Sequence, residues 1–235
     1  MKNILHLILI AFFFSLTIIS CSSDDSKTTD NTCASSDVSF LAVGGSGTIL
    51  TSADGTCWTA QTSGTTNNLR AFARKGSTAV VVGFSGTILT SSNAITWTSR
   101  TSGTTEHITN VTYSGSAFVA TGASGTILGS SDGITWADRT SSCGMTENIW
   151  GISSNSTVAV AVGDNGSIYT SADSGATTCT KRTSGTTVEF NGLLYGNSTF
   201  VAVGDNGTIL TSDNGTTWTS RTSGTSNNIR EVIYD

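Results

Sequence analysis

The chain contains no proline, and only 11% of its 235 residues are charged. Without proline, its turns must be made by Gly, Asn, Asp and Ser, which adopt or stabilise turn conformations. Acidic residues outnumber basic ones by 16 to 11 and form no basic cluster, so the sequence argues against nucleic acid as a partner. No phosphate-cradling loop, EF-hand pattern or cysteine pair with zinc spacing occurs, and we therefore expect neither a metal nor a cofactor.

Long apolar runs are also scarce, and the clearest one lies at the start of the chain. It covers residues 4–19 after a basic Lys2, and at about 16 residues it is shorter than the roughly 20 that cross a bilayer as a helix. Its end, Ile18-Ile19-Ser20-Cys21, resembles the lipobox of bacterial lipoproteins, which implies lipid attachment at Cys21. An ordinary cleaved signal and a membrane anchor are the alternatives.

We divide the chain into a lipoprotein signal peptide (1–20), a lipidated cysteine with a flexible polar tether (21–33) and a folded domain (34–235). The tether is small, polar and acidic, a composition that cannot form a core. Ser22 after Cys21 resembles the sorting signal of outer-membrane lipoproteins, so we expect a lipid-anchored protein of the bacterial envelope, at the outer membrane or the cell surface. Loss of residues 1–20 removes Lys2 and changes the formal net charge from −5 to −6.

Four cysteines remain besides Cys21. In an exported protein an even number indicates disulfides, and four cysteines allow three pairings. The repeat register favours Cys33 with Cys57 and Cys143 with Cys179, each linking the connection before a repeat to that repeat's own end. Four free, buried thiols are the alternative.

The sequence contains five copies of one repeat. Its Gly-Thr/Ser-Ile core begins at glycines spaced 39, 39, 41 and 41 residues apart, which are Gly47, Gly86, Gly125, Gly166 and Gly207. A period near 40 indicates repeated units that bury their apolar faces only against one another.

One repeat predicts four strands, at 69–75, 78–83, 87–91 and 96–102, joined by tight turns. The second strand is apolar on both faces, as at 79–82, so both faces of each sheet must be covered. Sheets packed face to face around an axis meet this need, and we predict an all-β, five-bladed β-propeller of four-stranded antiparallel blades. A β-solenoid is the structural alternative.

The ends of the repeat array suggest how the ring closes. The first copy begins at 39–43 with a second strand, whereas residues 228–234 match the first strand of the other copies. We therefore expect the C-terminal strand to join the N-terminal blade and close the ring, which removes exposed sheet edges. A fragment of a six- or seven-bladed ring is the alternative.

The turn between the third and fourth strands carries Ser-x-Asp/Asn-Gly-x-Thr-Trp, best seen at 212–218. It resembles the Asp-box, or bacterial neuraminidase repeat, and with the preceding AVGxxGTIL the chain is similar to the propeller family that includes photosystem II stability and assembly factors. Asp or Asn would bond the turn backbone and Trp would pack between blades. These structural residues are Asp54, Trp58, Asn93, Trp97, Asp132, Trp136, Asp173, Asn214 and Trp218.

The sequence argues against an enzyme. Asp-box sialidases need a convergent arginine cluster and an Arg-Ile-Pro-like segment, and this chain has no proline. Its arginines at one repeat position would instead lie around the outer strands; they are Arg100, Arg139, Arg182 and Arg221. His107 would have to serve alone as a base, and Asp164 and Asp205, the pair that a glycosidase would use, occupy equivalent tight turns.

We expect binding at the end of the propeller formed by the turns after the second strands and the connections after the fourth, because loops on a rigid frame usually bind. The candidate residues are Phe84, Glu106, His107, Asp164, Asn165, Asp205 and Asn206. The leading hypothesis is a non-catalytic, monomeric, envelope-anchored lipoprotein that binds a protein or glycan, with an assembly or adhesion role. A glycosidase-like hydrolase and a purely structural envelope protein are the alternatives.

Overall fold

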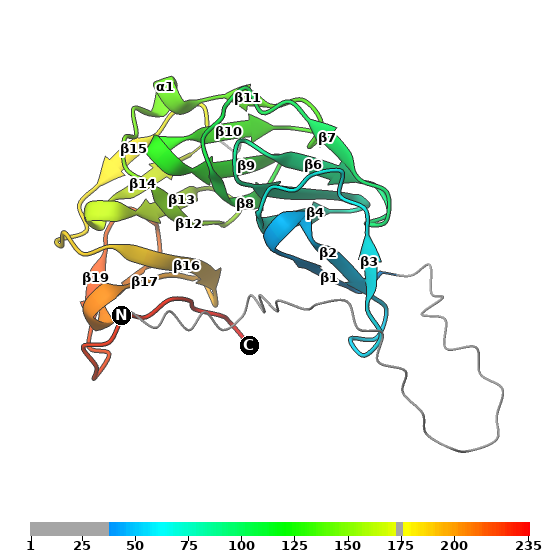
Figure 1. The fold of residues 1–235 in the computed structure, drawn as a ribbon. Helices are drawn as coiled ribbons and strands as arrows, with labels where there is room; N and C mark the ends of the chain where they lie inside the picture. Colours follow the sequence, from blue (N-terminus) through cyan, green and yellow to red (C-terminus); the bar gives the residue numbers. More distant parts are fainter. Residues whose placement is uncertain (1–37, 173–175) are drawn as a thin grey trace, which may run out of the picture.

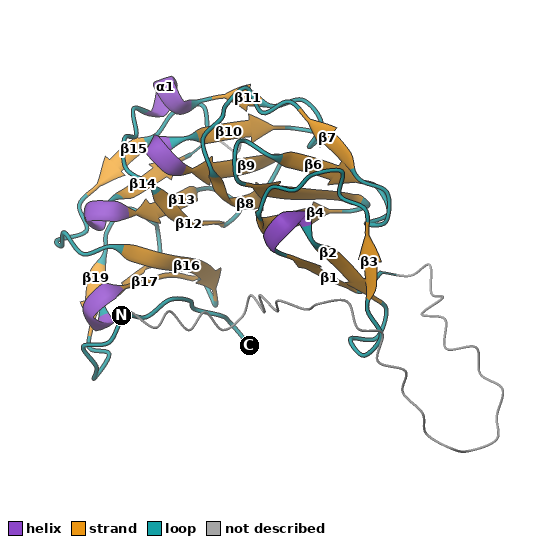
Figure 2. Ribbon diagram, in the orientation of Figure 1, coloured by secondary structure: helices purple, strands orange, loops and turns teal. Residues whose placement is uncertain are grey.

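The computed structural model describes residues 38–172 and 176–235. Within these ranges the chain is almost entirely β-structure, and helices are confined to short turns (Figure 2). No helix in the described ranges is both long and apolar enough to cross a membrane. The predictions for residues 1–37, which include Cys21 and Cys33, and the prediction for Asp173 lie outside the described residues.

The strands form five antiparallel sheets, each in sequence order, which we call units one to five. Unit one contains β1 (Phe40–Val43), β2 (Ile49–Ser52) and β3 (Thr59–Gln61). Unit two contains β4 (Leu69–Lys75), β5 (Thr78–Gly83), β6 (Ile88–Ser91) and β7 (Thr98–Arg100). Unit three contains β8 (Ile108–Ser114), β9 (Ala117–Gly122), β10 (Ile127–Ser130) and β11 (Ala137–Asp138). Unit four contains β12 (Ile149–Ser154), β13 (Ala159–Gly163), β14 (Ile168–Ser171) and β15 (Thr180–Arg182), and unit five contains β16 (Phe190–Gly196), β17 (Thr199–Gly204), β18 (Ile209–Ser212) and β19 (Thr219–Arg221).

The units follow one another along an arc, with units one and five at its two ends (Figure 1). The first strands β4, β8, β12 and β16 lie side by side. The core lies between neighbouring sheets: Val80 of unit two packs with Phe118 and Leu128 of unit three, and Val160 of unit four packs with Phe200 of unit five. The second strands are therefore buried on both faces, as their sequence predicts.

The predicted closing strand is not formed. Residues 222–235 belong to no strand, and unit one remains a three-stranded sheet. The last residues lie instead along unit five, where the backbone N–H of Ile229 donates to the Gly204 carbonyl at 3.0 Å and Tyr234 packs closely on Gly196. Leu69 makes the same bond to Gly44 at 2.9 Å. Unit five thus holds the C-terminal segment as unit one holds β4, but no ladder of backbone hydrogen bonds joins that segment to β1.

The turns between third and fourth strands share one hydrogen-bond pattern. Asp132 Oδ1 accepts the backbone N–H groups of Ile134 and Thr135 at 2.7 and 2.8 Å, and Trp136 Nε1 donates to the Gly133 carbonyl at 3.0 Å. These donors, with the Thr135 N–H first, lower the pKa of Asp132. Matching side-chain bonds form in three other units, through Asp54, Asn93 and Asn214.

The tryptophans of these turns differ in burial. Trp97, Trp136 and Trp218 are partly buried and pack against clusters that span two neighbouring units. Trp58 remains 40% exposed and lies beside Phe40, with ring centroids 6.4 Å apart. Packing between units therefore accounts for three of the four tryptophans named at this position.

The connection after unit three departs from the others. It forms a short helix, α1 (Thr140–Cys143), where the other connections between units contain bends and no helix. Cys143 forms a disulfide with Cys179, with their Cα atoms 4.6 Å apart. This bond links the connection before unit four to the fourth-strand end of the same unit. The pairing of Cys57 with Cys33 stays a prediction, because Cys33 lies outside the described residues.

Candidate functional site

The turns after the second strands gather at one end of the units. They are η1 (Gly45–Gly47), residues 84–86, η2 (Ala123–Gly125), η3 (Asp164–Gly166) and η4 (Asp205–Gly207). The middle residue of each turn has a left-handed conformation, with φ between 53° and 55°. At the glycine that follows, a Cβ would lie 1.9–2.1 Å from a backbone oxygen of the connection after the fourth strand; for Gly207 that oxygen belongs to Thr225. Close approach of this connection therefore explains why the core of every copy begins with glycine.

Four of these five turns are also bonded to the segment that follows their unit. The middle N–H donates to the side chain just before the next first strand in the pairs Ser46–Asn68 (3.0 Å), Ser85–His107 (3.2 Å) and Ser124–Asn148 (2.9 Å). In unit five, Asn206 donates to Asn228 of the C-terminal segment (3.0 Å). The corresponding residue between units four and five is Glu189. His107 thus takes a position that asparagine holds in three other copies, and its Nδ1 acts as the acceptor.

A β-bulge lies at the second residue of each first strand. The register shifts there in β4, β8, β12 and β16. A bulge redirects a side chain out of the regular alternation. Trp150 Nε1 then donates to Asp164 Oδ1 at 2.6 Å, and Asn191 Nδ2 donates to Asp205 Oδ1 at 2.9 Å. The bulged side chains of units four and five therefore reach the turn of their own unit.

Units two and three contribute an aromatic group at this end. Phe84 and His107 stack with ring centroids 4.1 Å apart and planes at 10°. The guanidinium of Arg70, the bulged residue of β4, lies 6.0 Å from the Phe84 centroid. Glu106 lies next to the pair, and its Oε2 accepts the Ser124 hydroxyl at 3.3 Å. Phe84 is partly exposed and His107 is exposed, so a flat surface faces solvent.

Units four and five contribute an acidic group. Asp164 accepts Asn148 Nδ2 at 2.9 Å in addition to Trp150, and Asp205 lies 3.6 Å from Arg230 Nη1. Burial raises the pKa of Glu189, and the negative charges of Asp164 and Asp205 raise it further against the opposing effect of Arg230. Three carboxyl groups therefore share a region with one cation beside them.

The predicted candidates fall into these two groups. The structure brings Phe84 together with His107 and Glu106. It also places Asp164 and Asp205 close enough to Glu189 that the charges of both raise the pKa of Glu189. Asn165 and Asn206 are the exposed tips of their turns. No cluster of three or more His, Cys, Asp or Glu side chains that could hold a metal occurs in the described part of the chain.

Sequence reasoning missed four residues of this end: Arg70, Trp150, Glu189 and Arg230. Each lies at or just before the start of a first strand, or at the equivalent position of the C-terminal segment. The available signal was the alignment of the copies, in which these two positions vary while the surrounding residues repeat.

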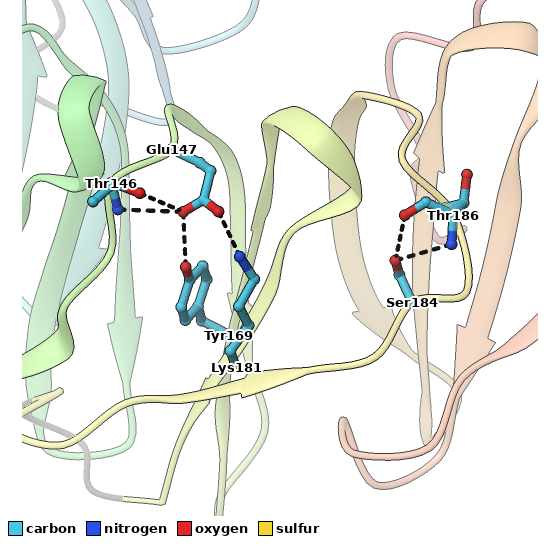
Figure 3. Close-up of polar contacts among 6 residues, drawn as sticks. All are labelled: Thr146, Glu147, Tyr169, Lys181, Ser184 and Thr186. Carbon is cyan, nitrogen blue, oxygen red and sulfur yellow. Dashed lines mark hydrogen bonds and ion pairs between the residues drawn. The ribbon is translucent and has the colours of Figure 1, made fainter.

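A separate polar cluster ties the connection before unit four to that unit's outer strands (Figure 3). Glu147 holds the repeat position of Glu106, but Lys181 Nζ approaches its Oε1 at 2.5 Å and the Tyr169 hydroxyl donates to its Oε2 at 2.8 Å. Burial opposes ionisation, yet the hydrogen bonds from Lys181 and Tyr169 prevail and lower the pKa of Glu147 to about 2. This carboxylate is therefore fully engaged within the fold.

Five successive antiparallel sheets with a core between them define the β-propeller class, and comparison with solved structures agrees. The structure "YCF48 bound to D1 peptide" matches with a TM-score of 0.61 at 17% identity over 78% of this chain and 63% of that one. "YCF48 from Cyanidioschyzon merolae" matches with 0.60 at 16% identity, over 80% and 69%. The computationally designed Ika4 protein matches with 0.52 at 17% identity, over 61% and 89%.

These likenesses concern the fold alone, because all identities are below 20%. The matched part of the chain spans 63% of the length of the peptide-bound YCF48. No protein-family model matches the chain, and no curated protein matches its sequence. The predicted all-β propeller fold is confirmed, whereas the predicted closing strand is wrong.

Proposed function

We propose that this chain is a protein-binding scaffold whose turn end takes up an extended basic peptide segment. The observation that carries the proposal is the excess of negative charge around Glu189, where three carboxyl groups lie near one cation, Arg230, on the same end as the Phe84–His107 stack. The turns that carry Phe84 and Asp205 are anchored by the hydrogen bonds of Ser85 to His107 and of Asn206 to Asn228, so both groups are held on a rigid frame. A propeller of the same fold, YCF48, has been solved with a D1 peptide, which supports a peptide as the kind of ligand.

The charge balance favours a cationic segment. A lysine or arginine entering the acidic group would favour the ionised form of Glu189, which the carboxylates of Asp164 and Asp205 now disfavour. The exposed stack offers a π-face for an arginine guanidinium or an aromatic side chain. A net charge of −5 for the whole chain would also steer a basic partner toward the surface.

The test is binding of the full-length chain to an array of 15-residue peptides that are basic, neutral or acidic. We expect retention of basic peptides, and at least a tenfold loss of affinity in Glu189→Gln/Asp205→Asn, since charge-assisted bonds contribute about 1.5–3 kcal/mol. Phe84→Ala should weaken peptides that also carry Arg or aromatic residues. Asp213→Asn is the matched control, because Asp213 is an exposed carboxylate in a turn at the opposite end. Equal retention of neutral or acidic peptides, or full binding by the variants, contradicts the proposal.

We further propose that the scaffold is monomeric and is anchored at the bacterial envelope through lipid on Cys21. The support is the lipobox-like segment, because a lipidated cysteine followed by a polar tether would present the domain away from a bilayer. Metabolic labelling with an alkyne fatty acid should tag the chain, and Cys21→Ser should remove the tag and release the protein from the membrane fraction. A labelled Cys21→Ser protein would refute the assignment.

We propose that the scaffold is non-catalytic. Both oxygens of Asp164 accept hydrogen bonds, and Asp205 is paired with Arg230, so both carboxylates have structural partners. The raised pKa of Glu189 favours one alternative, a glycoside hydrolase with Glu189 as acid. Release of nitrophenol from a panel of nitrophenyl glycosides, lost in Glu189→Gln, would establish that alternative. If the chain neither binds peptides nor hydrolyses glycosides, the remaining alternative is a structural envelope protein.

A further inference from the structure

Three arginines are held in one way on the outer strands. Each closes a fourth strand and donates its Nε to a threonine hydroxyl of the neighbouring third strand, in the pairs Arg100–Thr90 (2.7 Å), Arg182–Thr170 (2.8 Å) and Arg221–Thr211 (2.8 Å). This bond orients the guanidinium and leaves its two Nη groups for another partner. The ion pairs found among the described residues involve Lys181 and Arg230 rather than these arginines.

Arg139, the fourth arginine at this repeat position, shows what the threonine contributes. In unit three the equivalent third-strand residue is Gly129, and Arg139 Nε is buried with no hydrogen-bond partner among the described residues. The orienting bond is therefore specific to units two, four and five.

Two of the oriented arginines line cavities that recur in different units. The cavity in unit five measures about 590 Å³ and is bounded by Arg221, the 222–226 connection and Asn206. The cavity in unit two measures about 570 Å³ and is bounded by the equivalent Arg100, the 101–106 connection and Ser85. The arginine, the connection after the fourth strand and the turn residue are equivalent in the two cavities, so this pocket recurs in units two and five.

The walls are made of hydroxyl groups and backbone. Ser184 and Thr186 of unit four also line the unit-five cavity, and Figure 3 shows the compact turn they form, with the Ser184 hydroxyl bonded to the Thr186 N–H and carbonyl. Hydroxyl groups donate and accept hydrogen bonds and backbone carbonyls accept them, so these walls can bond the hydroxyl groups of a sugar. Volumes near 600 Å³ fall within the range of small-ligand sites.

We propose that these outer pockets bind the carboxylate-bearing sugars of an acidic polysaccharide. The free edge of the guanidinium supplies parallel N–H donors for a carboxylate, and the hydroxyl walls supply partners for the ring hydroxyls. Recurrence of the pocket in units two and five suits a polymer, since separate sugars of one chain can occupy both pockets and gain avidity. The arginines of these pockets are not part of the proposed peptide-binding end, and the pockets share only Glu106 and Asn206 with the candidate residues of that end. The proposal therefore does not rest on peptide binding.

The two pockets differ in one charge. Glu106 lines the unit-two pocket, whereas its counterpart Asn227 is neutral and does not line the unit-five pocket. A carboxylate beside the arginine opposes an anionic ligand. The unit-five pocket is therefore the stronger one, and Glu106→Gln strengthens binding in unit two.

The chain supplies its own template for the test variants. In unit one the position of these arginines is held by Gln61, whose Nε2 donates to Thr51 Oγ1 at 2.8 Å. Arg→Gln therefore keeps the orienting hydrogen bond and removes the charge together with the two Nη donor groups. Arg74→Gln is the matched control, because Arg74 is exposed on the β4–β5 hairpin at the opposite end.

The experiment is isothermal titration of the full-length chain with polygalacturonate, its fully methyl-esterified form and polyglutamate. We expect binding of polygalacturonate, about tenfold weaker in Arg221→Gln and about a hundredfold weaker in the Arg100/Arg182/Arg221→Gln triple variant, from the strength of charge-assisted hydrogen bonds. The Glu189→Gln/Asp205→Asn variant should bind it as the wild type does.

Three results overturn the proposal. If the esterified polymer binds as tightly as polygalacturonate, the pockets do not recognise the carboxylate. Polyglutamate binding equally or better means that the arginines take an acidic polypeptide. Arg74→Gln weakening binding as much as Arg221→Gln means that the attraction is unspecific charge. Melting curves that match the wild type show that the variants are folded.

Discussion

Gly207 and Gly224 allow a matched test of the idea that close approach of the connection fixes the repeat. Both have left-handed φ angles, 69° and 74°, and both lie in unit five. A Cβ on Gly224 would meet nothing within 4 Å, whereas one on Gly207 would lie 1.9 Å from the Thr225 carbonyl oxygen and 2.7 Å from Ser223 Oγ. The same substitution to alanine therefore carries the same conformational cost at the two sites and differs only in the contact.

The magnitudes follow from these contacts. Gly224→Ala should cost about 1–2 kcal/mol for a left-handed alanine. Gly207→Ala must also displace the connection by more than an ångström, which breaks both hydrogen bonds between Ser223 and Thr225 at about 1 kcal/mol each, for a total of about 3–4 kcal/mol.

Urea unfolding of the full-length chain, followed by tryptophan fluorescence, measures both free energies of unfolding. For a domain of this size the difference corresponds to about 4–8 °C in Tm, at about 2–4 °C per kcal/mol. If the two variants are equally stable, the connection yields at no cost, and close approach is not what requires glycine at this repeat position.

Substitutions at three further positions, with Phe72→Ala as a control, test other parts of the account. Asp132→Asn should leave stability nearly unchanged, because asparagine makes the same bonds in two other units, whereas Asp132→Ala should cost about 1 kcal/mol in thermal denaturation. Glu147 has a folded-state pKa of about 2 against an ordinary 4.5, so its stabilising effect is complete above pH 4.5 and is lost as the pH falls toward 2; a plot of Tm against pH should be flatter over that window in Glu147→Gln. Phe200→Ala should cost about 3–5 kcal/mol in urea unfolding because Phe200 is fully buried between units four and five, while Phe72→Ala, at a ring 46% exposed, should cost well under half as much.

The fold could be read from the sequence where local pattern and packing agree. The doubly apolar strand at 78–83 predicts burial on both faces, and β5 is buried there. Gly86 and its equivalents predicted the turns, because a tight turn requires particular residue types such as glycine. The bulge at Trp150 could not be predicted in this way, since a bulge depends on the register between two paired strands.

The candidate site could be predicted only in part for a similar reason. Phe84 and Asp164 were found because unusual residues stood at turn tips. Glu189 was missed because its raised pKa depends on carboxylates in two different turns, which only the packing of units four and five brings near it. The missing closing strand likewise concerns the relation of the first and last units, on which the repeat itself carries no information.

The hydrogen bonds from the turns of units one, two and three to the side chain before the next first strand have a consequence for folding order. Each of these units is completed by its successor, as Ser124 of unit three is by Asn148 of unit four, so the elementary folding step is a pair of neighbouring units. Stability should then be graded along the chain. Amide hydrogens in β8 to β14, which have neighbours on both sides, should exchange most slowly with solvent, and those of β1–β3 and residues 226–235 should exchange first.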